Sequence, residues 1–344
     1  MADQHSNPIS TLPHFSMKLE LARPISSLLL RIALQLPLLV AVVLIGQFVG
    51  IPSGVSALIA VVGWIACIWL LSLRKLLGLA AILVAISAIV YFFHQPSNDR
   101  DWRPEVARLP RSIIEGDTLR VENLRDFRWD SQTEFEERWL QTVYDLRTLE
   151  QLDAIVVPFG DSDLAAHVML SFGFADGRHL AVSIEARAEM GETYSLIGGA
   201  ARQLELFYLF GTEADLLGLR ILHRGDRVYS FPLDVDAGFA KELLLELSEA
   251  ANQLNERPKF YATLRHNCTT SLLRHVNRIS DQPLAFSREI LFPAQLGKLL
   301  HQLDLIETDL DWPEAKEAFR VDETIRSAKD LTTAFSDALR SSRP

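Results

Sequence analysis

Residues 32–93 hold only two charged side chains, Arg74 and Lys75. Turn residues at 50–54 and this basic pair divide the segment into three apolar runs, at 32–50, 55–73 and 76–93. Each run approaches the roughly 20 apolar residues that a helix needs to cross the hydrocarbon core of a bilayer. Three such runs in succession are difficult to bury in a water-soluble core. The sequence therefore predicts an integral membrane protein with three transmembrane helices.

Basic residues predict the orientation of these helices. Lys18, Arg23 and Arg31 precede the first run, and the basic pair lies between the second run and the third. Because the cytoplasmic flanks of membrane spans carry an excess of Lys and Arg, we expect residues 1–31 in the cytoplasm. Three spans then place the rest of the chain on the far side. In a bacterial inner membrane, that side is the periplasm.

The part of the chain that follows the apolar runs is acidic. Subtracting the five basic and two acidic residues of 1–93 from the totals of 34 and 44 leaves 29 basic and 42 acidic residues. This balance makes nucleic acid an unfavourable partner. The two cysteines, Cys67 in the second run and Cys268 far downstream, do not make a disulfide framework.

The remaining sequence predicts a polar linker at 94–116, a domain at 117–300 and a helical tail at 301–344. Within these ranges we expect strands at 117–129, 152–158, 165–174, 179–187, 216–223 and 227–233, and helices at 132–152, at 237–256, from Cys268, from Pro293 and within 313–341. Strands in the middle with helices around them indicate an α+β domain, with an antiparallel sheet packed on helices.

Cys268 lies at the predicted start of a helix. Asn267, Thr269 and Thr270 are residue types that cap helices, and apolar residues then follow at helical spacing. The peptide dipoles and the free N–H groups of a helix N-terminus stabilise a thiolate, which is the reactive form of cysteine. The alternative is an inert buried cysteine.

The hairpin predicted at 165–187 carries a histidine and an acid that could serve this thiol. If Ala175, Asp176 and Gly177 form a three-residue connection, paired residue numbers sum to 352 and His167 lies opposite Glu185 on the same face. A two-residue Asp-Gly turn would instead turn Glu185 to the other face. With the first register, Cys268, His167 and Glu185 can form a nucleophile, base and acid triad.

Other histidines compete for this role, and His167 alone on a half-apolar strand would more often be a hydrogen-bonded core residue. The competitors are His179, His223, His266 and His275. Their spacing does not suit a zinc site, and the sequence lacks both a Gly-x-Ser-x-Gly elbow and a phosphate-binding glycine loop. We therefore expect neither a metal nor a cofactor.

Three motifs resemble the Lnb-type N-terminal periplasmic domain family. They are His-x-x-x-Ser-Phe-Gly-Phe at 167–174, Ser-x-Glu-x-Arg at 183–187, and Phe-Tyr followed by Asn-Cys-Thr-Thr within 260–270. The resemblance covers about 118–300 and extends to Phe-Ser-x-x-x-Arg at 335–340. It implies a permuted papain-like (NlpC/P60-like) fold, with Cys268 as the nucleophile and His167 as the base. Glu185 as the residue that orients His167 comes from the hairpin register alone.

The best-understood members of this family are similar to lipoprotein N-acyltransferases. The resemblance implies a phospholipid as acyl donor, a lipoprotein amine or a peptide as acceptor, and a thioester on Cys268. Asn267, Thr269 and Tyr261 are the candidate oxyanion or support residues. The three-span anchor is not required by the resemblance. Two alternatives stay open: a cysteine peptidase or amidase acting on cell-wall peptides, and a non-catalytic, membrane-anchored binding domain.

Overall fold

The chain divides into two compact units, residues 1–94 and 95–344. The computed structural model describes residues 42, 55, 58–63, 73–192, 194, 198–199, 202–262, 268–284, 290, 292–306, 308–328, 335–341 and 343. In the first unit, helix α3 (Leu73–Phe93) covers the third predicted span. The first two predicted spans lie almost wholly outside the described residues. Across the described positions, none of the helices combines the length and the hydropathy needed to cross a membrane.

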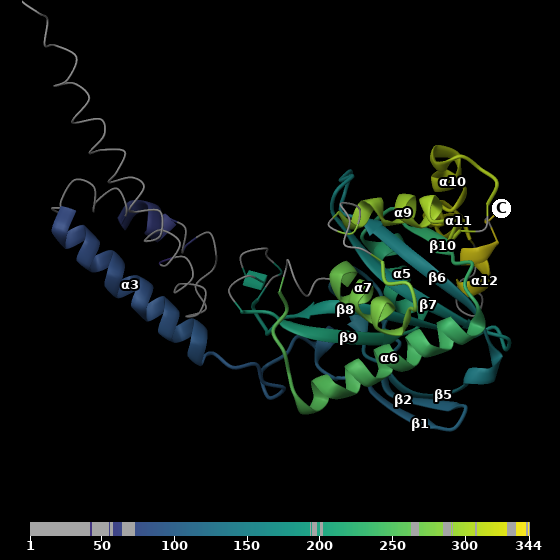
Figure 1. Cartoon of the computed structure of the whole chain (residues 1–344), viewed down its shortest axis with the longest axis horizontal. Coiled ribbons are helices and arrows are strands. Elements are labelled where there is room, and N and C mark those ends of the chain that lie inside the picture. Colours follow the sequence, from purple (N-terminus) through teal and green to yellow (C-terminus); the bar gives the residue numbers. More distant parts are fainter. Residues whose placement is uncertain are drawn as a thin grey trace, which may run out of the picture. The chain divides into compact units, whose positions relative to one another are not determined.

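The second unit is built on an eight-stranded sheet, which Figure 1 shows behind helices α6 and α7. Its order is β1-β2-β9-β8-β7-β6-β10, and β5 pairs with β2. The neighbours are antiparallel except β2 and β9, which meet in parallel at Arg125 and Gly211. The strands are β1 (Arg111–Glu115), β2 (Thr118–Arg125), β5 (Trp139–Asp145), β6 (Leu149–Pro158), β7 (Ala166–Phe174), β8 (His179–Arg187), β9 (Glu205–Gly211) and β10 (Tyr229–Pro232), with a separate pair β3 (Arg128–Trp129) and β4 (Phe135–Glu136).

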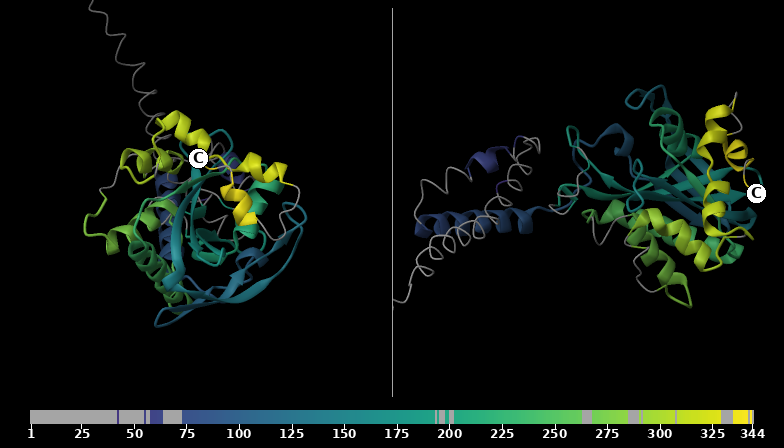
Figure 2. Two further views of the ribbon diagram at one scale, coloured as in Figure 1. Left: turned by 90° about the vertical axis from the view of Figure 1, so that its right-hand side faces the viewer. Right: turned by 90° about the horizontal axis from the view of Figure 1, so that it is seen from above.

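Helices cover both faces of this sheet (Figures 1 and 2). Because successive side chains of a strand point to opposite faces, the sheet feeds two cores. Val168 and Leu170 pack in the first core, with helices α6, α7, α9 and α10, whereas Met169 packs in the second, with α5, η3, α11 and α12. The bounds are α5 (Glu213–Gly218), the π-helix η3 (Leu219–His223), α6 (Ala237–Glu256), α7 (Cys268–Ile279), η4 (Pro293–Gln295), α9 (Leu296–Gln302), α10 (Trp312–Ala318), α11 (Asp322–Ser327) and α12 (Phe335–Arg340). The prediction of a mixed fold with helices packed on a sheet is confirmed.

The β7–β8 hairpin has the predicted register. Met169 pairs with Ser183 and Gly173 with His179, so the paired numbers sum to 352. The connection closes through a hydrogen bond from the Phe174 N–H to the Arg178 carbonyl at 3.0 Å. Gly177 takes a φ of 80°, in the left-handed region that glycine adopts without strain. The register therefore puts His167 and Glu185 on one face.

Two predicted elements are wrong. The helix predicted at 132–152 is instead β4, β5, a short 3-10 turn η2 (Leu146–Thr148) and the start of β6. Its apolar residues fit a helical period, but pairing of β5 with β2 overrides this local preference. The strand predicted at 216–223 is instead α5 and η3. Leu216, Leu217 and Ile221 are buried in the second core, and a short apolar run does not distinguish a buried strand from a buried helix.

The predicted linker, 94–116, is from residue 95 onward a folded part of the second unit. It holds a 3-10 turn η1 (Pro104–Val106) and strand β1, and Trp102 is buried. Arg187 of β8 donates to the carbonyls of Val106 and Ala107 and lies over the Trp102 ring. Arg187 thus has a structural role: it attaches this segment to the sheet.

Candidate active site

Cys268 is the first residue of α7, as predicted, and its side chain is buried. The sulfur lies 4.0 Å from the carbonyl oxygen of Ala166 and 3.8 Å from Oγ1 of Thr269. The backbone N–H of Val168 donates a hydrogen bond to it. The β7–β8 ladder ends at Met169 and Ser183, so Cys268 takes the next position along the edge of β7. The thiol is therefore held by the main chain of the strand that carries His167.

His167 belongs to a network on the opposite side of this strand end. Its Nε2 lies 3.0 Å from Oε1 of Glu185 and 2.6 Å from Oγ of Ser183. The Ser183 hydroxyl in turn donates to Oε1 of Glu185 at 2.7 Å. Because Nε2 faces these two oxygens, Nδ1 is the nitrogen left for the sulfur, and the thiol and the ring form a hydrogen bond. The structure thus brings Cys268, His167 and Glu185 together.

The three groups shift one another's pKa values. Burial alone would lower the pKa of His167, but the Glu185 carboxylate and the thiol outweigh it and raise the pKa to about 9. Burial alone would raise the pKa of Cys268, but the hydrogen bond and the charge of His167 hold it below its ordinary value. The pKa of Glu185 is lowered in spite of burial, chiefly by His167. These directions favour a thiolate paired with an imidazolium, with a carboxylate beyond them.

Ser183 and Arg220 are site residues that the sequence reading did not identify. Ser183 stands two residues before Glu185 in the Ser-x-Glu-x-Arg motif, so the period of a strand could have placed both on one face. Arg220 lies on η3, and its charge lowers the pKa of both Glu185 and His167. Its position depends on a π-helix where the sequence predicted a strand, so nothing local indicated it.

The predicted support residues have different surroundings. Thr269 lies beside the sulfur. Tyr261 is buried, with its ring 6.2 Å from that of Tyr194, and its pKa is raised by burial, by Tyr194 and by the nearby Cys268. Asn267 lies outside the described residues.

The competing histidines that the structure describes are engaged elsewhere. His275 bonds to the Tyr208 hydroxyl and to Glu246, and His179 contacts the carbonyl of Gly177 in the hairpin turn. His223 ends η3, and its carbonyl accepts from Gln132. His266 lies outside the described residues. His167 is thus the histidine that the described part of the chain brings to the thiol.

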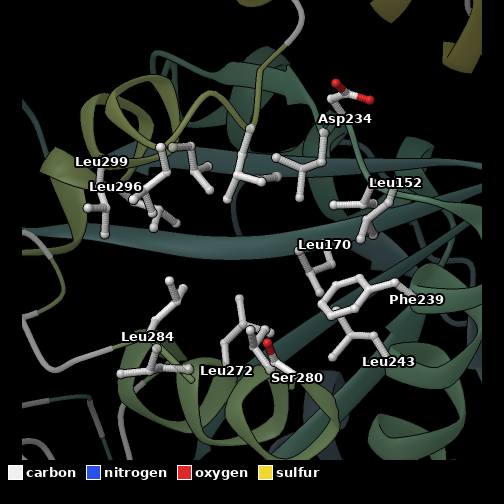
Figure 3. Close-up of a pocket in the computed structure, with 18 of the residues that line it drawn as sticks. Leu152, Leu170, Asp234, Phe239, Leu243, Leu272, Ser280, Leu284, Leu296 and Leu299 are labelled. Carbon is white, nitrogen blue, oxygen red and sulfur yellow. The ribbon is translucent and has the colours of Figure 1, made fainter. Parts of the chain in front are cut away.

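Two cavities of opposite character flank this site. A cavity of about 230 Å³ on the Glu185 side is lined by Glu185 itself and by several arginines, among them Arg103, Arg220 and Arg224. A larger cavity of about 440 Å³ on the α7 side is lined mainly by leucines (Figure 3). Thr269 is also among its lining residues. The thiol therefore lies between a charged space and an apolar one.

The resemblance suggested by the motifs is confirmed by comparison with protein-family models. The model for the Lnb N-terminal periplasmic domain matches residues 135–302, which include Cys268, His167 and Glu185. No curated protein and no solved structure matched the chain. The permuted papain-like fold accordingly stays a prediction. Residues 135–302 belong to the Lnb N-terminal periplasmic domain family.

Proposed function

We propose that this protein is a thiol-dependent acyltransferase of the bacterial inner membrane, with its catalytic domain in the periplasm. The observation that carries this proposal is the arrangement of Cys268, His167 and Glu185. The thiol begins a helix, its pKa is lowered, and it is hydrogen-bonded to a histidine that an acid and Ser183 hold. A nucleophile, a base and a residue that orients the base are the parts that acyl transfer through a covalent intermediate requires.

In the first step, the Cys268 thiolate attacks the ester carbonyl of a phospholipid. A carbon–sulfur bond forms, and the charge that develops on the carbonyl oxygen is stabilised by the backbone N–H groups of Cys268 and Thr269 at the start of α7. The bond between the carbonyl carbon and the glycerol oxygen then breaks. His167, protonated in the resting pair, gives its proton to the departing alcohol. The products are a Cys268 thioester and a lysophospholipid.

In the second step, the N-terminal amine of a lipoprotein attacks the thioester. Neutral His167 takes a proton from the amine, the carbon–sulfur bond breaks, and the thiolate is restored with an amide as the product. Glu185 and Ser183 hold the ring in one orientation through both steps, because both contact Nε2. His167 thus returns to its protonated form after each cycle.

The predicted anchor supports a lipid substrate. Three spans at residues 32–93 would hold the catalytic domain at the bilayer surface, where both the phospholipid and the lipoprotein are concentrated. The family is described as a periplasmic domain, which agrees with the side of the membrane that the basic residues predict.

A second candidate is a cysteine peptidase or amidase that acts on cell-wall peptides. The observation that favours it is the cavity on the Glu185 side, where Arg103, Arg220 and Arg224 could bind a peptide carboxylate by donating hydrogen bonds to it. This reaction would use the same thiolate and the same histidine. Attack on the peptide bond would form a peptidyl thioester on Cys268 and release an amine. Water would then hydrolyse the thioester.

Labelled phospholipid tests the first candidate. Full-length protein in liposomes that contain phospholipid with a labelled acyl chain should acquire a hydroxylamine-sensitive label on Cys268. The label should be lost in Cys268→Ala and His167→Ala and retained in the matched control His179→Ala, since His179 lies in the hairpin turn away from the thiol. Transfer of label to an acceptor by Cys268→Ala would overturn the proposal. Cleavage of cell-wall peptides without any lipid-derived thioester would favour the second candidate.

A further inference from the structure

The apolar cavity lies between one face of the sheet and three helices. Strands β6 and β7 contribute Leu152 and Leu170, helix α6 contributes Phe239 and Leu243, and helices α7 and α9 close the other sides (Figure 3). Among the residues that the structure describes, 22 line the cavity, of which 17 are apolar and 12 are leucines. Its volume, about 440 Å³, is in the range of ligand-binding pockets. A space lined in this way suits hydrocarbon better than water.

This cavity adjoins the thiol. A second, much smaller space is lined by Cys268, and Leu170 and Leu272 line both spaces. Thr269, whose hydroxyl lies 3.8 Å from the sulfur, also lines the larger cavity. Leu170 and Leu272 thus stand between the sulfur and the cavity, on the same face of the sheet, and an acyl group attached to the sulfur would reach the cavity by passing between these two side chains.

The cavity extends along β7 away from the thiol. The N–H of Val168 bonds to the sulfur, Leu170 follows on the same face, and Phe172 pairs with Leu152. Phe172 is four positions after Val168, which corresponds to about 14 Å along the strand. Figure 3 shows Leu152, Phe239 and Leu243 together at one end of the cavity and Leu296 and Leu299 at the other. Leu243 lines the cavity but not the small space at Cys268.

The opposite side of the strand end offers polar groups. There, Glu185 and Arg220 line the charged cavity, and Ser183 contacts His167. The alcohol that leaves in the first step and the amine that attacks in the second both exchange protons with His167, so they approach from its side. The acyl chain of the thioester therefore lies on the other side, in the cavity that is lined by leucines.

We propose that the leucine-lined cavity receives the acyl chain of the Cys268 thioester, and that Leu243 and its neighbours limit the length of the chain. This inference rests on the proposed acyl transfer and adds to it the site and the length selection of the donor chain. Each methylene buried in such a site strengthens binding by a factor of about four, up to the length that fills the space.

The test uses full-length protein and p-nitrophenyl esters from acetyl to palmitoyl. The rate of thioester formation on Cys268 is measured by mass spectrometry. For the wild type, kcat/KM should rise about fourfold per methylene and then level off. Leu243→Phe should move the levelling point to shorter chains and slow the longest ester at least tenfold, with the acetyl ester changed less than twofold. Leu243→Ala should move it to longer chains, so the two variants give opposite shifts. Ile114→Phe on the exposed surface of β1 is the control.

The outcomes separate this inference from the proposed function. If Cys268 is acylated but neither Leu243 variant alters the profile of rates against chain length, the cavity does not hold the donor chain and the acyl-transfer proposal stands. Failure of every ester, short or long, to acylate Cys268 overturns both.

Discussion

The Cys268 thiol is buried, and burial by itself would keep it neutral. It depends on His167 for its lowered pKa. We predict that His167→Ala raises the pKa of Cys268 above its ordinary value, because the two largest contributions that oppose burial both come from His167. Alkylation of Cys268 by iodoacetamide, followed as a function of pH with peptide mass spectrometry, measures this pKa. An unchanged midpoint in His167→Ala would show that the pair does not form.

Glu185 sets the pH above which acyl-thioester formation falls, because it raises the pKa of His167. The His167 imidazolium gives a proton in the first step, and its pKa is raised to about 9, so acyl-thioester formation should fall as the pH rises through about 9. The acid that raises this pKa is Glu185, so Glu185→Gln should move the falling limb to lower pH, toward the ordinary value of 6.5. The readout is kcat/KM for a soluble ester against pH. A falling limb that stays near 9 in Glu185→Gln argues against an orienting carboxylate.

Ser183 contacts both His167 and Glu185 through one hydroxyl. We predict that Ser183→Ala slows acyl-thioester formation about tenfold, because a lost hydrogen bond in a buried site costs about 1–1.5 kcal/mol. The unfolding midpoint and the KM should change little, since alanine fits the space of serine. Ser183→Thr, which keeps the hydroxyl, should recover part of the rate. A raised KM with an unchanged kcat would instead assign Ser183 to substrate binding.

At the scale of elements, helix α12 and the residues after it are attached to α5 and to strand β6 by buried charges. Arg340 lies 2.7 Å from Glu213, and Arg343 lies 2.9 Å from Asp153; both acids are fully buried. Because removal of one partner leaves a buried charge unpaired, Arg340→Ala should lower the free energy of unfolding by about 3–5 kcal/mol. Urea denaturation followed by circular dichroism measures this change. The control is Arg111→Ala, whose partner Glu122 lies 4.0 Å away on the surface and whose loss should leave the midpoint unchanged.

Elements with strong local patterns could be predicted from the sequence. The hairpin register followed from alternating apolar residues and from Gly177, and α6 was predicted with its observed bounds, since its Asp236 cap and its apolar stripe are local signals. The same register brought His167 to Glu185. The site itself was therefore predictable to the extent that it depends on one hairpin and one helix start.

Elements whose state depends on distant contacts could not be predicted. Strand β9 is buried over its whole length and so lacks an alternating pattern. Strand β5 pairs at one edge with β2, and its mixed pattern of exposure resembles a helix as much as a strand. Helix α5 begins at the Thr212 cap, but its function in holding Arg125 and Arg340 through Asp215 and Glu213 exists only once the chain has folded. Arg220 beyond it was hidden for the same reason.

At the scale of the whole molecule, the proposed reaction requires the catalytic domain and its two substrates to meet at one membrane surface. The donor is a bilayer lipid and the acceptor is itself lipid-anchored, so a soluble enzyme would have to extract at least one of them. Residues 32–93 would restrict the search to the plane of the membrane. The orientation of the anchor therefore decides whether the enzyme reaches its substrates at all.

The basic residues predict this orientation, with residues 1–31 in the cytoplasm and residues 95–344 in the periplasm. Full-length protein with one epitope at the N-terminus and another at the C-terminus tests it. In spheroplasts, external trypsin should remove the C-terminal epitope and leave the N-terminal epitope intact, and in inverted membrane vesicles the pattern should reverse. Replacing Arg74 and Lys75 by glutamine and adding two lysines to the turn at 50–54 should weaken the bias, because it is set by the basic residues that flank the spans. Digestion of both epitopes from the same side in intact spheroplasts would contradict three spans, and with them the proposed access to lipoproteins from the periplasm.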